Sequence, residues 1–367
     1  MKAAQAKKAP ARRRWLGGAA ALVAAGLAPA LAAAAAPKGN AAVTGGAADK
    51  AGASPAARNA GVAADGVWVQ AALPQARQTD LRSRHTGQHY RIFISIPDMP
   101  APAAGHPVIY ALDGNASFPS LALMARTVAR RSKVTGRTAP VVVGIGYASG
   151  EDYDGVARSR DYTPPSAKAT DKEGGADRFL DFIEQELKPQ IAALAKIDMQ
   201  RQALFGHSYG GLFTLHALFT RPAAFQTFIA ASPSIWWGER FILSEQAGLA
   251  VRAAAATRKP QLLLTVGELE QAVAPGKQLS ERSAMLMEKR MVDAARDLAA
   301  DLQKQTAAAA SAEQGIANSS GPAKDGNAPA GAAKAVLSRV RFLALAGEDH
   351  GSALFPALSR GLEFFLE

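Results

Sequence analysis

The sequence of 367 residues predicts an α/β fold, in which a mainly parallel central sheet is covered by helices on both faces. Two observations predict it. Short apolar runs typical of buried strands recur along the chain, at residues 108–112, 141–145, 203–205, 228–230, 262–266 and 342–345. Segments with helical periodicity lie between and after them, at residues 118–131, 176–194, 212–219, 241–256, 280–304 and 352–366. Strands that alternate with helices in this way form parallel sheets with both faces buried.

The start of the chain has the composition of an export signal. Residues 1–14 carry six lysines and arginines and no acidic residue, and a weakly apolar run at 15–31 leads into alanines before Pro37. This is the pattern of a secretory signal peptide, whereas the run is short for the alternative, a membrane anchor. We therefore expect residues 1–36 to be removed and the mature protein to be periplasmic or secreted, away from the membrane. The arginines at 12–14 also fit twin-arginine export, so the export route stays open.

Charge and cysteine content exclude several classes of function. The net charge of the whole chain is +11, and the six cations of the predicted signal peptide leave +5 for the mature protein. Because no basic stripe with interleaved aromatic residues is present, nucleic-acid binding is not expected. The chain has no cysteine, which rules out disulfides and thiolate ligands, and no group of His, Asp and Glu has metal-ligand spacing. We expect neither a metal nor an organic cofactor.

The folded domain is expected to span residues 66–367. Residues 37–65, rich in Ala, Gly and Asn and without periodicity, are predicted to be a disordered linker. The domain begins with a predicted antiparallel hairpin, because alternating apolar residues at 81–84 and 90–96 flank a turn that contains Gly87. A domain of this length can bury a sufficient hydrophobic core without disulfides.

Three later segments depart from the regular alternation. Residues 148–175 are polar and long for a connection, which is typical of a cover over an active site. Residues 306–333 are of low complexity and are predicted to be a disordered surface insertion. Residues 144–150 contain three glycines after a strand and resemble a dinucleotide-binding loop. However, the third glycine comes one position late and no helix follows, so dinucleotide binding is not expected.

The most informative motif is Gly206-His207-Ser208-Tyr209-Gly210, between an apolar strand and an apolar helix. It matches the G-x-S-x-G nucleophile elbow of the α/β-hydrolase fold, where a sharp turn exposes the serine hydroxyl above the sheet. Glycines flank the turn because strand and helix backbones pass too close for side chains. A serine hydroxyl is a poor nucleophile until a base accepts its proton, so the motif requires a histidine elsewhere.

His350 is the predicted base. Of the six histidines, it alone lies directly after the last predicted strand and before the final helix. In the α/β-hydrolase order of serine, acid and histidine, this is the position of the base. The predicted acid is Glu270, which follows the strand at 262–266, and Glu268 is its rival. Asp349, beside the histidine, is interpreted as a turn residue.

Two backbone N–H groups are needed to stabilise the oxyanion that forms during ester cleavage. One is predicted to be that of Tyr209, the residue after the nucleophile. The other is expected from the loop after the strand at 108–112, from Gly114 or Asn115. Asp113, which precedes them, is also a candidate cap for the helix that follows.

Together, these motifs resemble those of a known family. Residues 206–213 and 231–237 resemble the esterase D-like α/β hydrolases, and most closely their siderophore trilactone hydrolases, which act on enterobactin, salmochelin and bacillibactin. Supporting motifs lie at residues 110–115, 158–164, 179–189 and 347–352, and the resemblance spans about residues 78–365 outside the insertion. It implies Ser208 as nucleophile and His350 as base. Some members of that branch resemble Ser–His dyads, so the presence of an acid stays open.

Catecholate siderophores are anionic and aromatic, which points to four substrate-binding candidates. Arg158 and Arg160, in the polar segment, are candidates to face the negative charge, and Trp236 and Trp237 to form an aromatic wall. The alternatives are that the tryptophans belong to the core and that Arg160 pairs with Asp161.

The expected function is a serine esterase that hydrolyses carboxylic esters through an acyl-enzyme, with a catecholate siderophore trilactone as preferred substrate. The same site would suit an acyltransferase or a general acyl esterase if the acceptor or the substrate differed. A member of another class, a ligand-binding protein without catalysis, would have no need of an activated serine. The partner expected on all three hypotheses is a small molecule.

Overall fold

The chain divides into two units, Met1–Val69 and Gln70–Glu367. The computed structural model describes residues 68, 70–254, 256–272, 281–319 and 336–367. The predicted signal peptide at 1–36 and the predicted linker at 37–65 lie outside the described residues. The second unit contains every predicted site residue, and the description that follows concerns this unit.

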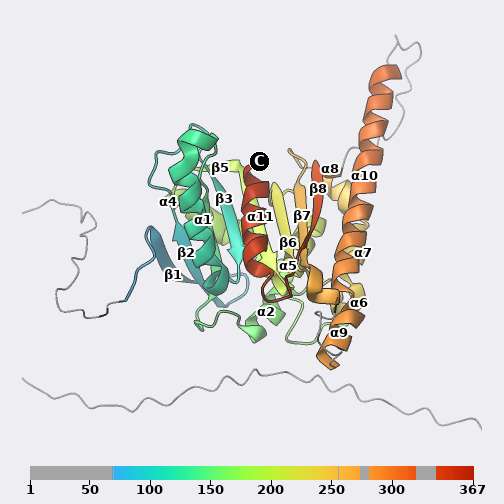
Figure 1. The fold of residues 1–367 in the computed structure, drawn as a ribbon, viewed down its shortest axis with the longest axis horizontal. Coiled ribbons are helices and arrows are strands. Elements are labelled where there is room, and N and C mark those ends of the chain that lie inside the picture. The colour runs from blue at the N-terminus through green and yellow to red at the C-terminus, as the bar shows by residue number, and fades with distance from the viewer. Residues whose placement is uncertain (1–67, 69, 255, 273–280, 320–335) are drawn as a thin grey trace, which may run out of the picture. The chain divides into compact units, whose positions relative to one another are not determined.

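Within the described ranges, eight strands form one sheet in the order β1-β2-β4-β3-β5-β6-β7-β8 (Figure 1). β2 is antiparallel to both β1 and β4, whereas all other neighbouring strands are parallel. The bounds are β1 Ala76–Arg82, β2 His89–Ser95, β3 His106–Leu112, β4 Val141–Tyr147, β5 Ile197–His207, β6 Thr227–Ala231, β7 Gln261–Gly267 and β8 Arg339–Leu345. The predicted α/β-hydrolase fold, with its N-terminal antiparallel hairpin, is therefore confirmed.

Helices bury both faces of the sheet (Figure 1). α1 (Gly114–Thr135) and α11 (Leu354–Leu366) cover one face, where Phe118 and Leu358 pack with Ile109 and Phe205. The other face is covered by α2 (Gly155–Tyr162), α3 (Ala176–Phe182), the π-helical turn η1 (Ile183–Leu187), α4 (Lys188–Leu194), α5 (Tyr209–Thr220), α6 (Trp237–Arg240), α7 (Ile242–Gln246), α8 (Leu249–Ala254) and α10 (Met291–Ser319). In the part of the chain that is described, no helix is both long and apolar enough to cross a membrane.

Besides the segment at 306–333, three predicted segments differ in the structure. The polar segment 148–175, expected as a loop, contains α2. The predicted helix at 241–256 is divided into α7 and α8. The predicted helix at 280–304 is divided into α9 (Glu281–Lys289) and α10, and Arg290 between them has a left-handed backbone with a φ of 51°.

The expectation of disorder at 306–333 was wrong for its first part, because α10 continues to Ser319. Alanine, which dominates residues 306–319, has the highest intrinsic helix propensity. The earlier turns of α10 also pack on the domain through the buried Leu298 and Leu302. The segment therefore extends an existing helix, which costs less than starting a new one. Residues 320–335 lie outside the description.

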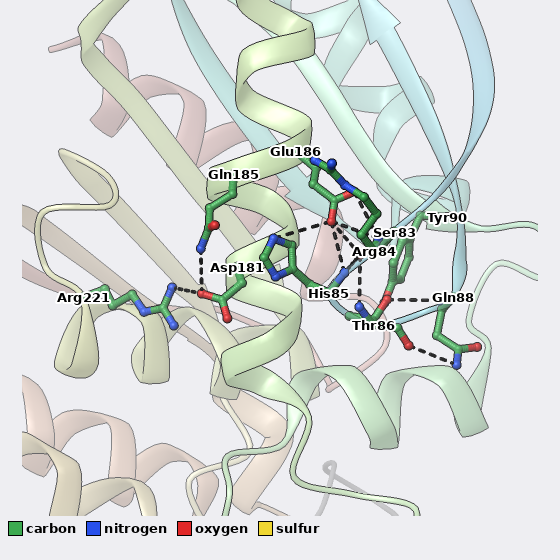
Figure 2. Close-up of polar contacts among 10 residues, drawn as sticks. All are labelled: Ser83, Arg84, His85, Thr86, Gln88, Tyr90, Asp181, Gln185, Glu186 and Arg221. Carbon is green, nitrogen blue, oxygen red and sulfur yellow. Dashed lines mark hydrogen bonds and ion pairs between the residues drawn. The ribbon is translucent and has the colours of Figure 1, made fainter.

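A buried carboxylate fixes the turn between β1 and β2. Figure 2 shows Glu186, on η1, surrounded by the residues of this turn. The Ser83 hydroxyl donates to Glu186 Oε1 over 3.1 Å, and the backbone N–H groups of Arg84 and His85 donate to the same oxygen over 3.0 and 3.2 Å. Because these contacts join residues about 100 positions apart, they tie the hairpin to the helical layer.

A second buried cluster joins three helices around His216, on α5. Its Nε2 lies 3.1 Å from Asp177 Oδ1 on α3, and its Nδ1 lies 2.8 Å from Glu245 Oε2 on α7. Burial lowers the pKa of His216, but hydrogen bonds to the two carboxylates outweigh it, so the pKa lies above 6.5. Each carboxylate accepts a proton donor, so the cluster requires the imidazolium form.

This cluster predicts a loss of stability as the solution becomes basic. A raised folded-state pKa contributes stability that is fully present below pH 6.5 and is lost as pH rises through the folded pKa. We expect Tm to fall as pH increases above 6.5, and the His216→Gln variant to show a smaller fall. Thermal unfolding of both proteins from pH 6 to 9 checks this expectation. Parallel Tm curves for the two proteins would contradict it.

Candidate active site

Ser208 lies on a strained turn between β5 and α5. Its backbone has a φ of 61° and a ψ of −116°, a conformation that nonglycine residues rarely adopt. A Cβ on Gly206 would lie 2.1 Å from the carbonyl oxygen of Gly210, so this position must be glycine. The Ser208 N–H donates to the Ala231 carbonyl over 2.9 Å, and the Ser208 carbonyl accepts from the Ser234 N–H over 3.1 Å. The end of β6 and the loop after it therefore hold the turn in place.

His350 lies next to Ser208 in the loop between β8 and α11. Its Nε2 is 3.0 Å from Ser208 Oγ, and its Nδ1 is 2.7 Å from Glu270 Oε2. The Asp349 carboxylate accepts the N–H groups of Gly351 (2.9 Å) and Ser352 (3.0 Å), which is the part expected of a turn residue. With Nδ1 donating to Glu270, Nε2 is left to accept the serine proton.

Glu270 lies on the 3₁₀ turn η2 (Glu268–Gln271) that follows β7, and it is fully buried. Its Oε1 accepts the Ser232 hydroxyl over 2.5 Å and the Gly267 N–H over 2.7 Å, while its Oε2 faces His350. Glu268, the rival acid, instead accepts the Gly347 N–H over 3.2 Å at the surface. The structure therefore brings Glu270, and not Glu268, to the histidine.

His207, between the glycine and the serine of the elbow, is kept neutral. Burial and the nearby His350 lower its pKa to about 3. The two imidazole rings lie with their centroids 4.9 Å apart. Because His207 carries no charge at neutral pH, it does not oppose the positive charge that His350 acquires when it accepts a proton.

The N-termini of α1 and α5 lie at the same edge of the sheet, since β3 and β5 are parallel neighbours. The N–H groups in the first turn of a helix have no acceptor within the helix, and the residues predicted as oxyanion donors, Gly114, Asn115 and Tyr209, occupy these positions. The Asn115 side chain is already engaged. Its Oδ1 accepts the Tyr147 N–H over 2.9 Å and its Nδ2 donates to the Tyr147 carbonyl over 3.3 Å.

The glycines of the segment that resembled a dinucleotide loop have a packing role. A Cβ on Gly114 would lie 2.7 Å from the backbone carbon of Gly144. A Cβ on Gly146 would lie 2.0 Å from Asn115 Oδ1. Gly144 and Gly146 of β4 therefore let the start of α1 approach the sheet closely.

Both predicted substrate-binding arginines form internal ion pairs. Arg158 donates from Nε and Nη2 to Asp113 over 2.7 and 3.2 Å, and its side chain is 13% exposed. Arg160 donates to both oxygens of Asp161 over 2.7 and 2.8 Å, which is the alternative considered for it. Asp113 precedes α1 whereas Asp161 lies on α2 itself, so the two ion pairs are separate contacts of α2.

The two tryptophans differ. Trp237 is buried and its indole N–H donates to Glu173 over 3.2 Å, so it belongs to the core and not to an aromatic wall. Trp236 is half-buried, with its ring centroid 6.2 Å from that of Tyr209, the neighbour of the nucleophile. It lines an open hollow of about 450 Å³ together with Arg240, Met285 and Lys289, among others.

Lys289 was missed by the sequence analysis. Its Nζ lies 3.9 Å from the centroid of the Trp236 ring, within the range of a cation–π contact. The lysine stands at the end of α9 in a segment with no motif, 53 positions along the chain from the tryptophan. No local signal in the sequence could have found this contact.

A buried carboxylate, an imidazole and a serine hydroxyl, hydrogen-bonded in line at the edge of an α/β sheet, define a serine hydrolase of the α/β-hydrolase class. The chain belongs to the Putative esterase family, whose model matches residues 83–308. It is 38% identical to the ferri-bacillibactin esterase BesA of Bacillus subtilis, over 80% of this chain and 90% of that protein. The siderophore triacetylfusarinine C esterase of Aspergillus fumigatus is 36% identical, over 80% and 94% of the two chains.

Solved structures agree with this family. The crystal structure of the BES protein from Bacillus cereus has a TM-score of 0.65 and 33% identity, and covers 82% of this chain and 98% of its own. The resemblance to the siderophore branch of the esterases is therefore confirmed. The protein is a carboxylic ester hydrolase.

Proposed function

We propose that this protein is a serine esterase that cleaves the ester bonds of a catecholate siderophore trilactone through an acyl-enzyme on Ser208. The observation that carries the proposal is the hydrogen-bonded line from Glu270 through His350 to Ser208. The substrate is supported by the relatives, which are named for bacillibactin, enterobactin, salmochelin and triacetylfusarinine C.

In the acylation step, Ser208 Oγ attacks the ester carbonyl while His350 Nε2 takes the hydroxyl proton. The Glu270 carboxylate accepts the hydrogen bond of the Nδ1–H group, which stays protonated, and stabilises the imidazolium. As the tetrahedral intermediate collapses, His350 returns the proton to the leaving alkoxide, and the acyl group remains on the serine. The N–H groups of Tyr209 and of Gly114 or Asn115 are the proposed donors to the oxyanion.

In the deacylation step, water attacks the acyl-serine and gives its proton to the same histidine nitrogen. The carboxylic acid leaves, and the proton returns to Ser208 Oγ. Arg158 is occupied by Asp113 and takes no part in proton transfer.

The hollow beside Trp236 suits an anionic aromatic group. It carries the cations of Arg240 and Lys289 next to an aromatic face, together with the carboxylates of Glu239 and Glu288. Glu239 pairs with Lys168, so its charge is already compensated. Burial lowers the pKa of Lys289, and among the described residues no carboxylate lies within ion-pair distance of its ammonium. Burial removes water from this ammonium and so destabilises its charged form. An anion from the substrate would offset that loss.

The proposal is tested by comparing turnover of a catecholate trilactone with that of p-nitrophenyl esters of increasing chain length. We expect the trilactone to have the highest kcat/KM. Equal or poorer turnover of the trilactone would contradict the proposed substrate and favour the alternative of a general esterase. Product analysis in the presence of an added alcohol separates the acyltransferase alternative, because a transferase forms a new ester whereas a hydrolase releases the acid.

Lys289→Met is expected to lower kcat/KM for the trilactone about fivefold, the scale of one partly exposed charge contact of about 1 kcal/mol. Turnover of neutral p-nitrophenyl butyrate should stay within about twofold, because this ester presents no anion to the ammonium. Lys304→Met, at an exposed position of α10, is the matched control and should alter neither substrate. An equal loss on both esters would show that Lys289 does not recognise charge.

We also propose that the mature protein works outside the cytoplasm, in the periplasm or secreted. Support comes from the basic start, apolar run and alanine-rich stretch of residues 1–36. N-terminal sequencing of the protein recovered from cell fractions tests this. A mature protein that begins near Pro37 in the exported fraction is expected, and a cytoplasmic protein that retains residues 1–36 would contradict the proposal.

A further inference from the structure

We infer that Arg158 is a positioning residue for the oxyanion site, holding the loop before α1 and the nucleophile elbow in fixed relation. The inference rests on the proposed esterase function, and it assigns to Arg158 a part in catalysis without contact to the substrate. The two proposed groups of oxyanion donors stand on separate elements, at the starts of α1 and α5. Their spacing therefore depends on whatever joins these two elements.

One guanidinium contacts the residues that lead into both helices. Its Nε and Nη2 donate to the two carboxylate oxygens of Asp113 over 2.7 and 3.2 Å, and Nη2 also donates to the His207 carbonyl over 3.3 Å. Asp113 immediately precedes Gly114, and His207 immediately precedes Ser208 and Tyr209. Arg158 thus bridges the residues that precede the two sets of donors.

The strand register explains how one side chain reaches both residues. Ala111 of β3 is paired with Phe205 of β5 in parallel, so the positions two residues further on, Asp113 and His207, come level at the end of the sheet. The first turn of α5 also packs on this loop, since a Cβ on Gly210 would lie 3.5 Å from Asp113 Oδ2. The bridge therefore spans a short gap between neighbouring elements.

The loop that Arg158 holds has a conformation that needs support. Asp113 has a φ of 50° and a ψ of 51°, in the left-handed region that side chains disfavour. Its N–H donates to the Tyr162 hydroxyl over 3.2 Å, and Tyr162 lies on α2 together with Arg158. One helix therefore supports both the side chain and the backbone of Asp113.

Buried charge makes this support specific to a forked cation. Burial raises the pKa of Asp113, and the charge and hydrogen bonds of Arg158 oppose that rise. Lysine would supply a positive charge, but its three N–H donors share one compact nitrogen, and it cannot present the planar fork that engages a carboxylate and a carbonyl together. Arg158→Lys should therefore keep the ion pair and lose the bridge.

The decisive experiment measures Arg158→Lys with p-nitrophenyl butyrate and with phenylboronic acid, which forms a tetrahedral adduct on a reactive serine. Removing one oxyanion donor lowers kcat by about 10²–10³-fold, so misplacing one should lower it by roughly 10–100-fold. We expect KM to stay within about threefold, and the inhibition constant of the boronic acid to rise in parallel with the loss of kcat. If Arg158 had a merely structural role, Arg158→Lys would lower the fraction of folded protein. The kcat and the boronic acid inhibition constant of the folded protein would then stay unchanged.

Two further variants keep the test decisive. Arg221→Lys is the matched control, because Arg221 donates to Asp181 over 2.6 Å and to Glu184 over 3.1 Å just past the other end of α5 (Figure 2 shows Arg221 with Asp181). It should leave kcat and the boronic acid affinity unchanged. Tyr162→Phe removes the acceptor of the Asp113 N–H with little change in volume, and should lower kcat about three- to tenfold at constant KM.

The outcomes separate the inference from the proposed function. If the wild type hydrolyses no ester, the proposed function is wrong. If the wild type is active and folded Arg158→Lys keeps its kcat and boronic acid affinity, the positioning role is wrong. A loss in Arg221→Lys equal to that in Arg158→Lys would also overturn it. Should Arg158→Lys not fold, an unchanged kcat in Tyr162→Phe would overturn the inference, and the expected loss would support it.

Discussion

Ser208→Ala is expected to abolish ester hydrolysis, with a fall in kcat of about 10⁶-fold, the scale of removing a serine nucleophile from a triad. The reason is that Ser208 Oγ is the atom 3.0 Å from the His350 base, and the strained turn presents it to the substrate. Without the hydroxyl no acyl-enzyme forms, and the oxyanion donors alone can assist only a direct attack by water. The measurement is the initial rate on p-nitrophenyl butyrate and on a catecholate trilactone.

Covalent labelling distinguishes a lost nucleophile from a lost fold. A fluorophosphonate should add to the wild type at Ser208 and should not add to Ser208→Ala, while the two proteins share the same Tm within a few degrees. Ser359→Ala, at an exposed position of α11, is the matched control and should label and turn over normally. An adduct that persists in Ser208→Ala, or no adduct on the wild type, would exclude Ser208 as the nucleophile.

The elbow and the base could be predicted because each lies in a local sequence pattern, and the order of strands and helices along the chain shows what that pattern means. The G-x-S-x-G pattern around Ser208 is typical of a tight turn between strand and helix, and His350 follows the last strand. The carboxyl ends of parallel strands meet at one edge of the sheet. Residues 142 positions apart in the chain could therefore be expected to meet, and the structure places them in hydrogen-bond contact.

The ion pair of Arg158 could not be predicted from the sequence, because no local pattern relates its two members. Arg158 and Asp113 are 45 positions apart, and nothing around either residue in the sequence indicates that they pair. The pairing depends on α2, a helix inside a segment whose composition is typical of a loop. Such contacts are decided by tertiary packing, so the sequence itself shows only two charged residues that lie far apart in the chain.

The neighbouring tryptophans show a further limit of the sequence. Trp236 and Trp237 have the same chemistry and adjacent positions, yet one is half-buried beside Tyr209 and the other is buried against Glu173. Gly238 and the two residues after it have positive φ values, so the chain bends sharply just past this pair. No periodicity in the sequence reports the direction of such a bend.

The acid was the least certain member of the site at the level of sequence, and Glu270→Gln tests it most sharply. Glu270 Oε1 accepts two donors, the Ser232 hydroxyl and the Gly267 N–H. In the variant, the amide oxygen must therefore stay at this position, and the amide NH₂ must face His350 Nδ1. Two donors cannot share that contact, so the histidine is driven to the tautomer that carries its proton on Nε2.

A histidine with its proton on Nε2 cannot accept the proton of Ser208, and we expect kcat to fall by about 10⁴-fold with little change in KM. Glu268→Gln, two residues away and bonded at the surface to the Gly347 N–H, is the matched control and should stay within about twofold of the wild type. A Ser–His dyad predicts instead that Glu270→Gln loses less than tenfold. That outcome would reduce Glu270 to a structural carboxylate, whereas the larger loss would assign it to the catalytic triad.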